Sequence, residues 1–253
     1  MKIAVFLTSI VCCLFTPVFA QPKTQPKTKT APAPVSANPY QEADSLFTFG
    51  DDADRDKQSL GLIEKALAAN GNDYQWMWRA ARAYYFVGEK AAKAEKVSYY
   101  EKGINVGQRA VAAQSEGAEG HFWLGVNYGG YADQKGVFKA LTTVKKIRAE
   151  METVLRLNDH YQDGGAYLAL GEMDRQLPRL FGGNMNRSIQ RLEQGLSVAP
   201  HNLEIKLALG QAYEEKGRKE DARRMYQEII NKQSPTKAEG HVQEKAKRFI
   251  GKL

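Results

Sequence analysis

Two consecutive segments near the C-terminus carry the same spacing of large and small residues, and each segment closes on a proline. The matching positions, in chain order, are Leu170, Gly171, Ser188, Leu192 and Pro200, followed by Leu209, Gly210, Tyr213, Ala222, Tyr226 and Pro235. The first segment has five extra residues in its turn, and the two prolines are 35 residues apart. This spacing predicts pairs of helices that cross closely at the small residues. Such a pair cannot bury its apolar stripe alone, so neighbouring pairs must stack.

The pattern resembles the tetratricopeptide repeat, which has a period of about 34 residues. Three weaker copies precede the clear ones, at Ala43, Leu46 and Phe47 with Ser59, Ile63 and Ala66; at Trp78, Ala81, Arg82 and Tyr85 with Gly103, Gly107 and Ala110; and at His121, Leu124, Gly125 and Tyr128 with Ile147, Met151 and Val154. Residues Gly136 to Thr143 lengthen either the turn or the second helix of the third copy. We therefore expect an all-α solenoid of about five helix pairs.

The chain beyond Pro235 predicts one last amphipathic helix through Val242, Ala246, Phe249 and Ile250. Its many lysines and arginines give it the polar outer face that a terminal capping helix needs. Between Tyr40 and this end there are only three prolines and no sustained alternation of apolar and polar residues. We therefore expect no sheet.

The N-terminus has the pattern of an export signal. Lys2 is followed by an apolar run and by Val18-Phe19-Ala20, so residues 1–20 are interpreted as a signal peptide cut after Ala20, with an uncleaved anchor as the alternative. Residues 21–38 form a Pro/Lys/Thr-rich linker whose composition is typical of a disordered tether. Residues 39–253 form the repeat domain. We expect the mature chain to reach the periplasm or to be secreted, with no transmembrane segment.

Motifs for catalysis, metal binding and nucleic-acid binding are absent from the sequence. His121, His160, His201 and His241 have no ligand spacing, and His121 occupies a packing position. Both cysteines, Cys12 and Cys13, lie in the predicted signal peptide. There is no nucleophile elbow, phosphate loop or HExxH motif. The net charge of +7 is partly collected in residues 216–253 without interleaved aromatic residues. We expect no enzyme, no cofactor, no metal site and no nucleic-acid partner.

The turn inside the fourth helix pair is longer than a repeat requires. Residues 176–184 form this inserted loop, in which Pro178 stops the preceding helix and Gly182 and Gly183 permit positive φ. Two interpretations stay open: the loop tucks Leu180 and Phe181 back against the repeat, or it forms the lip of a binding cleft. As candidate site residues of the loop we take Pro178, Arg179, Phe181, Gly182 and Gly183.

The same region resembles a family of periplasmic proteins. The resemblance rests on Asp163-Gly164-Gly165-Ala166-Tyr167, Leu170-Gly171, Leu177-Pro178 and Phe181-Gly182-Gly183-Asn184. This string is similar to the T-component family associated with tripartite ATP-independent periplasmic (TRAP) transporters. The resemblance implies a helical repeat fold that docks the transporter's solute-binding subunit and tends to oligomerise. Eukaryotic regulators of microtubule dynamics share a similar repeat tract, but the predicted signal peptide argues against a cytoskeletal role.

Template positions on the first helices predict which side chains face the concave side of the solenoid. They are Trp76, Arg79, Phe86, Phe122, Val126, Leu168, Glu172, Arg175, Leu207 and Gln211. Aromatic and aliphatic residues outnumber charges in this set, which favours a groove for an apolar helix, an extended peptide or an amphipathic ligand. The alternative is that tight curvature makes these residues fill the lumen.

We predict from these features a non-enzymatic exported scaffold that binds another protein, with a solute-binding subunit as the specific candidate and homo-oligomerisation left open. Two alternatives remain. One is a carrier that holds a small hydrophobic ligand in the concave channel, and the other is a general envelope-assembly scaffold without a transport link.

Overall fold

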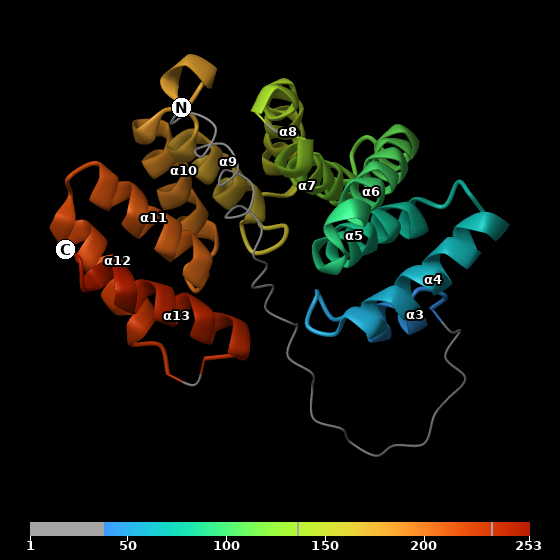
Figure 1. Ribbon diagram of the computed structural model, residues 1–253, viewed down its shortest axis with the longest axis horizontal. Coiled ribbons are helices and arrows are strands. Elements are labelled where there is room, and N and C mark those ends of the chain that lie inside the picture. Colours follow the sequence, from blue (N-terminus) through green and yellow to red (C-terminus); the bar gives the residue numbers. More distant parts are fainter. Residues whose placement is uncertain (1–37, 136, 234) are drawn as a thin grey trace.

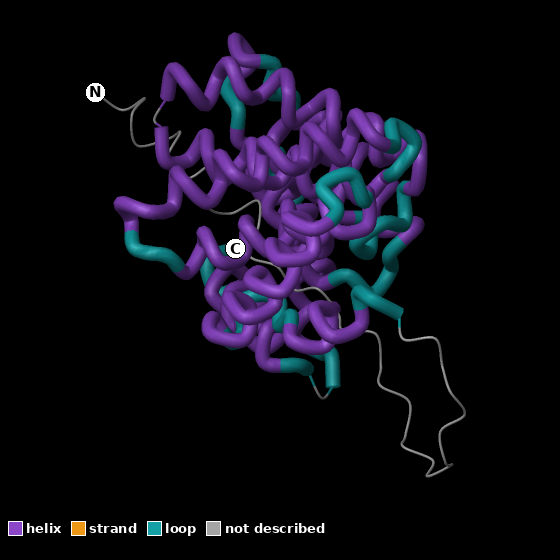
Figure 2. The backbone as a smooth tube through the Cα atoms, turned by 90° about the vertical axis from the view of Figure 1, so that its right-hand side faces the viewer, coloured by secondary structure: helices purple, strands orange, loops and turns teal. Residues whose placement is uncertain are grey.

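The computed structural model describes residues 38–135, 137–233 and 235–253, and side chains are not described at 137–141 and 237. The predicted signal peptide and nearly all of the predicted linker lie outside these residues. The described part contains eleven α-helices, one 3₁₀ turn and no strand (Figure 2), which confirms the all-α prediction. None of these helices combines the length and the apolar composition needed to cross a membrane.

The helices pair in chain order and follow one another around an open arc (Figure 1). The five pairs are α3 (Gln41–Leu46) with α4 (Ala53–Ala69), α5 (Tyr74–Lys90) with α6 (Lys93–Ala113), α7 (Ala118–Lys135) with α8 (Val137–Asn158), α9 (Gly165–Gln176) with α10 (Met185–Val198), and α11 (Leu203–Glu215) with α12 (Lys219–Ile230). A final helix, α13 (Lys237–Ile250), packs on α12 and α11. Five pairs and a capping helix are the predicted architecture.

Polar side chains fix where several of the helices begin. The Asp73 side chain accepts hydrogen bonds from the amides of Gln75 and Trp76 at the start of α5. The Asn202 side chain accepts from the second and third amides of α11 in the same way. Thr236 and Glu239 form a reciprocal capping box on α13. These caps satisfy backbone N–H groups that have no partner inside the helix. The repeat boundaries are therefore encoded locally, one helix at a time.

The second and third pairs are longer than the others and repeat each other's spacing. Helices α5 and α7 begin 44 residues apart, at 74 and 118, and so do α6 and α8, at 93 and 137. Helix α7 ends at Lys135 and α8 begins at Val137. The extra residues therefore lengthen the second helix and not the turn: α6 and α8 have 21 and 22 residues, whereas α10 and α12 have 14 and 12.

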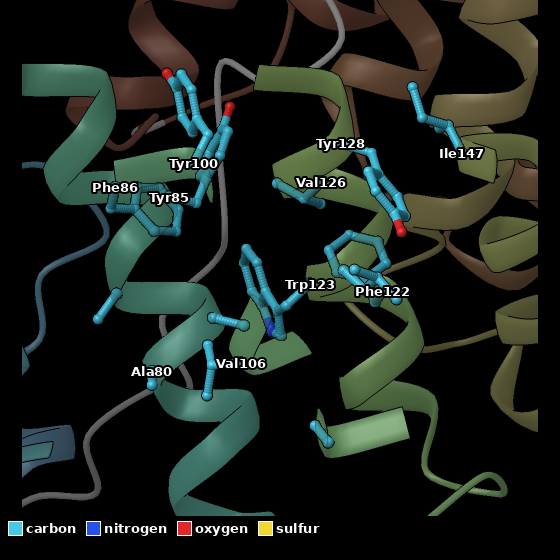
Figure 3. Close-up of a cluster of buried hydrophobic side chains, with 14 of the residues drawn as sticks. Ala80, Tyr85, Phe86, Tyr100, Val106, Phe122, Trp123, Val126, Tyr128 and Ile147 are labelled. Atoms are coloured by element: carbon cyan, nitrogen blue, oxygen red, sulfur yellow. The ribbon is translucent and has the colours of Figure 1, made fainter. Parts of the chain in front are cut away.

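Small residues mark the closest crossings, as predicted. A Cβ atom on Gly171 would lie 2.6 Å from Leu192, and one on Gly210 would lie 2.5 Å from Tyr226. The long pairs are joined by a buried aromatic cluster with Trp123 at its centre (Figure 3). The Trp123 ring centroid lies 5.1 Å from that of Phe122 and 5.8 Å from that of Phe86. These contacts bind α5 and α7 into one core.

We expect Gly103→Ala to destabilise the fold, because its Cβ would lie 2.0 Å from Oδ1 of Asn127. Asn127 is fully buried and donates to the carbonyls of Ala81 and Trp123, so it has little room to move. The loss should be about 1–3 kcal/mol. Gly61→Ala is the matched control, since no atom lies within 4 Å of its Cβ. The control should gain ~0.5–1 kcal/mol. Urea unfolding measures both, and equal midpoints would contradict the packing described.

Candidate functional site: the concave face and the inserted loop

The ten residues predicted to line the concave groove fall into two classes in the structure. Phe86, Phe122, Val126 and Leu207 are 2%, 1%, 0% and 4% exposed. The first three point into the packed interior in Figure 3. They fill the core because the first helices of neighbouring pairs pack directly against each other. The other six lie in two separate clusters, on α5 and on α9 with α11, and two of them, Arg79 and Glu172, are also buried. Only Trp76, Leu168, Arg175 and Gln211 are left partly exposed to line a groove.

The cluster on α5 is built around a carboxylate from α3. Nε and Nη2 of Arg79 donate to Asp44 at 3.0 and 2.9 Å, and Nη2 of Arg82 donates to it at 2.8 Å. The guanidinium of Arg79 lies over the Trp78 ring at 4.2 Å from its centroid. Burial opposes the charge of Asp44, but the hydrogen bonds and charges of the two arginines hold the pKa of this carboxyl below its usual range. Arg79 thus fastens the short α3 helix onto α5.

The cluster on α9 and α11 is also an ion-pair network. Arg175 donates to both oxygens of Glu172, at 2.9 and 2.8 Å, and also to Glu215 near the end of α11. Glu172 is 3% exposed, so its charge is committed to this network. Leu168 and Gln211 are half-buried at its edge. The concave face therefore presents few free charges and only two partly exposed apolar side chains among the predicted ten, Trp76 and Leu168.

Glu204, in the first turn of α11, faces this cluster and was not singled out from the sequence. Burial raises the pKa of its carboxyl to about 7, and the charge of Glu172 adds to the rise, while Lys245 on α13 opposes it. A raised folded-state pKa means that the ionised form is disfavoured in the folded chain.

The inserted loop has a defined conformation. After Pro178, residues Arg179–Phe181 form a 3₁₀ turn, and Gly182 follows with φ +90°. A Cβ on Gly183 would lie 1.6 Å from the Leu177 carbonyl oxygen, so this position requires glycine. The amides of Phe181 and Gly183 both donate to the carbonyl of Pro178. Pro178 and Gly182 thus act as predicted, with the helix ending before Pro178 and a positive φ at Gly182, whereas Gly183 has no positive φ and is required only by the close approach of the Leu177 carbonyl.

The loop's two apolar side chains point in different directions. Phe181 packs against the core, as the structural interpretation expected. Leu180 is 86% exposed and is the one large hydrophobic residue displayed to solvent among the described residues. The interpretation that the loop tucks back therefore holds for Phe181 and not for Leu180, and the interpretation of the loop as the lip of a binding cleft stays a prediction. Beside Leu180, Arg179 is exposed.

A buried carboxylate anchors this loop, and sequence reasoning missed it. Asp174 near the end of α9 is 1% exposed and accepts from Arg148 at 2.7 Å and from Nε and Nη2 of Arg187 at 2.6 and 2.5 Å. Arg191 lies 3.5 Å away. Nη2 of Arg187 also donates to the Gly182 carbonyl at 2.6 Å, and the Asp174 carbonyl accepts from the Asn184 amide at 2.7 Å. Asp174 therefore ties α8, α9, α10 and the loop together.

His121 has a structural environment. Its Nδ1 lies 2.6 Å from Glu150 Oε2 and its Nε2 lies 2.9 Å from the Ser115 carbonyl oxygen. The hydrogen bond to Glu150 raises the pKa of the imidazole, against the effect of burial. This ring joins α7 to α8 and to the turn that precedes them. Among the described residues, no three His, Cys, Asp or Glu side chains gather in a group suited to a metal ion.

Two open depressions flank α6, one on the side of α7 and α8 and the other on the side of α4 and α5. Their volumes are about 440 and 590 Å³, and both are lined by Glu101 and Asn105 of α6. Each also contains a tyrosine from a first helix with a lysine over its ring: Tyr128 with Lys146 in one, Tyr84 with Lys102 in the other. The tyrosine and the lysine of one depression each lie 44 residues from their counterparts in the other, which is the spacing of the two long helix pairs. Charged and amide side chains line both depressions, so neither is an apolar ligand cavity.

Comparisons with known proteins agree with this architecture. A tetratricopeptide-repeat protein of Thermus thermophilus, TTC0263, superposes with a TM-score of 0.61 at 19% identity, covering 83% of this chain and 96% of that one. MamA superposes with a TM-score of 0.51 at 16% identity, covering 85% and 99%. A tetratricopeptide-repeat family model matches residues 182–241. The chain is a tetratricopeptide-repeat solenoid.

A second family model covers the remaining pairs. The model described as regulator of microtubule dynamics protein 1-3 matches residues 40–172, more than half of the chain, and the chain belongs to this family. The first match ends at residue 172 and the second begins at residue 182, so most of the inserted loop lies between them. No curated protein sequence matches the chain. The comparisons lend no support to the resemblance to the TRAP T component.

Replacing Asp174 by Asn should cost on the order of 3 kcal/mol, because it leaves three arginines around a site without a charge to pair with. Asp221→Asn is the matched control, since Asp221 pairs with Arg218 and Arg224 on the surface of α12. Exposed pairs contribute ~1 kcal/mol or less. Guanidinium unfolding distinguishes the two, and a loss at position 174 no larger than at 221 would contradict the anchoring role.

Glu204→Gln should make stability less dependent on pH. Because the folded-state pKa is raised to about 7, the wild-type chain loses stability as pH rises from about 4.5 through 7. Gln removes that loss, so the variant should match the wild type at pH 4.5 and exceed it by on the order of 1–3 kcal/mol at pH 8. Glu220→Gln, at an exposed site in the first turn of α12, is the control. The melting temperatures of the wild type and Glu204→Gln are compared from pH 4.5 to 8. An equal change with pH in both chains would contradict the raised pKa of Glu204.

Proposed function

We propose that this chain is a non-enzymatic scaffold that binds another protein outside the cytoplasm, with the inserted loop as its main contact. One observation carries the proposal: Leu180 is 86% exposed on a turn whose backbone is held by Gly183, Arg187 and Asp174. A large apolar side chain in this position contributes nothing to the core. On a rigid turn it loses little conformational entropy when a partner covers it.

The fold supports the same conclusion. Stacked helix pairs give an extended surface, and insertions in such proteins lie on one face that often binds a partner. Trp76 and Leu168, which were predicted to face the concave side, are partly exposed and would add apolar contact area. Tryptophan is enriched where interfaces carry most of their binding free energy.

The N-terminus supports an extracytoplasmic place of action. Residues 1–20 carry the pattern of a signal peptide, and residues 21–38 have the composition of a polar tether. The printed description of the family names microtubule dynamics. An exported chain does not meet microtubules, so we propose that this member uses the family fold on an extracytoplasmic partner.

The partner we propose in narrower terms is a solute-binding subunit of a TRAP transporter, docked by this chain as a T component. Only the string from Asp163 to Asn184 supports this step, together with the predicted export. A general envelope-assembly scaffold is the same function with a different partner. A small-ligand carrier is less favoured, because the depressions at α6 and at the inserted loop are open and have charged walls.

A photo-crosslinking amino acid at position 180 should form an adduct with a discrete protein in the source cell. The same amino acid at Lys57, an exposed residue of α4, is the matched control and should give no such product. Mass spectrometry of the adduct identifies the partner. A solute-binding subunit supports the T-component proposal, and another envelope protein supports the general scaffold. Tubulin would overturn the extracytoplasmic assignment, and identical products at both positions would overturn the role of Leu180.

A further inference from the structure

The inserted loop borders a depression of about 500 Å³ whose charges are unbalanced. Its wall includes Arg175, Arg179 and Lys216 together with the first residues of α10. Asp174 also lines it, but the Asp174 side chain has 0% exposure and faces its three arginines. Glu172 and Glu215 are engaged by Arg175. Arg179 and Lys216 have no ion-pair partner within the part of the chain that the structure describes.

The position of these two cations relative to Leu180 defines a mixed surface. Arg179 directly precedes Leu180, and Lys216, the C-cap residue of α11, lines the same depression. The start of α10 lines it as well, and the amides of its first turn favour negative charge. Asn184 caps only the Arg187 amide among these groups. The two cations and the N-terminal end of α10 therefore all favour an anion in the depression, next to the apolar side chain of Leu180.

We propose that this loop surface, made by Arg179, Leu180 and Lys216, docks an extended protein segment in which an acidic side chain lies next to a large apolar one. The proposal rests on the protein-binding function proposed above and adds the chemistry of the partner. The acidic side chain enters the depression between Arg179 and Lys216, and the apolar side chain covers Leu180. Charge complementarity of this kind sets specificity and speeds association.

A protein segment fits this surface better than a lipid bilayer does. Stable membrane binding needs more than one apolar or basic signal over a wide area. Here Leu180 is a single exposed large apolar residue among the described ones, and Glu215 presents a carboxylate at the rim of the same surface. A depression of this size instead matches one or two side chains of a peptide.

The test is selection of random dodecapeptides displayed on phage against the full-length chain. The enriched peptides should carry Asp or Glu within two residues of Leu, Ile, Phe or Trp. An enriched peptide, made synthetically and labelled, should bind at least tenfold more weakly to the double variant Arg179→Glu/Lys216→Glu and to Leu180→Asp. Binding to the wild type should weaken between 50 and 500 mM salt.

The matched control is Lys57→Glu/Lys65→Glu, which makes the same charge change at exposed positions on α4. Peptide affinity should be unchanged in this control, and all variants should keep the wild-type circular dichroism melt. Enrichment without acidic residues, or equal weakening in control and loop variants, overturns the inference. Co-sedimentation with anionic phosphatidylglycerol vesicles that needs Arg179 and Lys216, without any peptide enrichment, also overturns it. A discrete protein crosslinked at position 180 then leaves the protein-binding function standing while this inference fails.

Discussion

The close approach of helices at small residues is the constraint on which the rest of this structure depends. Each helix pair leaves an apolar stripe that only the next pair can cover, so the fold is held by interfaces between neighbours. Gly171 and Gly210 sit where the two helices of one pair cross, and Gly103 sits where α6 meets α7 of the next pair. At each of these positions a side chain would overlap the facing helix. The apolar faces of the pairs are therefore buried between helices. Contacts with a partner must come from the residues that remain exposed after stacking.

The inserted loop contains the most exposed of these residues, Leu180. Its backbone is held from below by Asp174, which is fully enclosed by α8, α9 and α10 and paired to arginines of two of these helices. The same contacts that stabilise the middle of the solenoid therefore fix the turn that displays Leu180. The stability of the solenoid and the conformation that exposes Leu180 are therefore coupled, because Arg187 donates to both the Asp174 carboxylate and the Gly182 carbonyl.

The sequence predicted the repeat order, the small-residue crossings and the capping helix, because each depends on local spacing. It predicted the turn at Pro178 and Gly182 for the same reason. The groove assignment was wrong for Phe86, Phe122, Val126 and Leu207, which are buried. It depended on a template of 34-residue repeats, which does not describe the longer pairs that hold the first three, whereas Leu207 is buried in a pair of ordinary length. The Asp174 site was beyond sequence reasoning, because Arg148 and Asp174 lie 26 residues apart and meet only when α8 packs on α9.

The loop is a preformed platform and not a flexible connection, and the proposed function depends on this rigidity. Hydrogen–deuterium exchange of the free chain, resolved to residues 177–184, measures it directly. The amides of Phe181, Gly183 and Asn184 donate to the carbonyls of Pro178 and Asp174, so they should exchange as slowly as the first turns of the flanking helices. Exchange of these three amides at the rate of an unstructured peptide would contradict the platform and the function built on it.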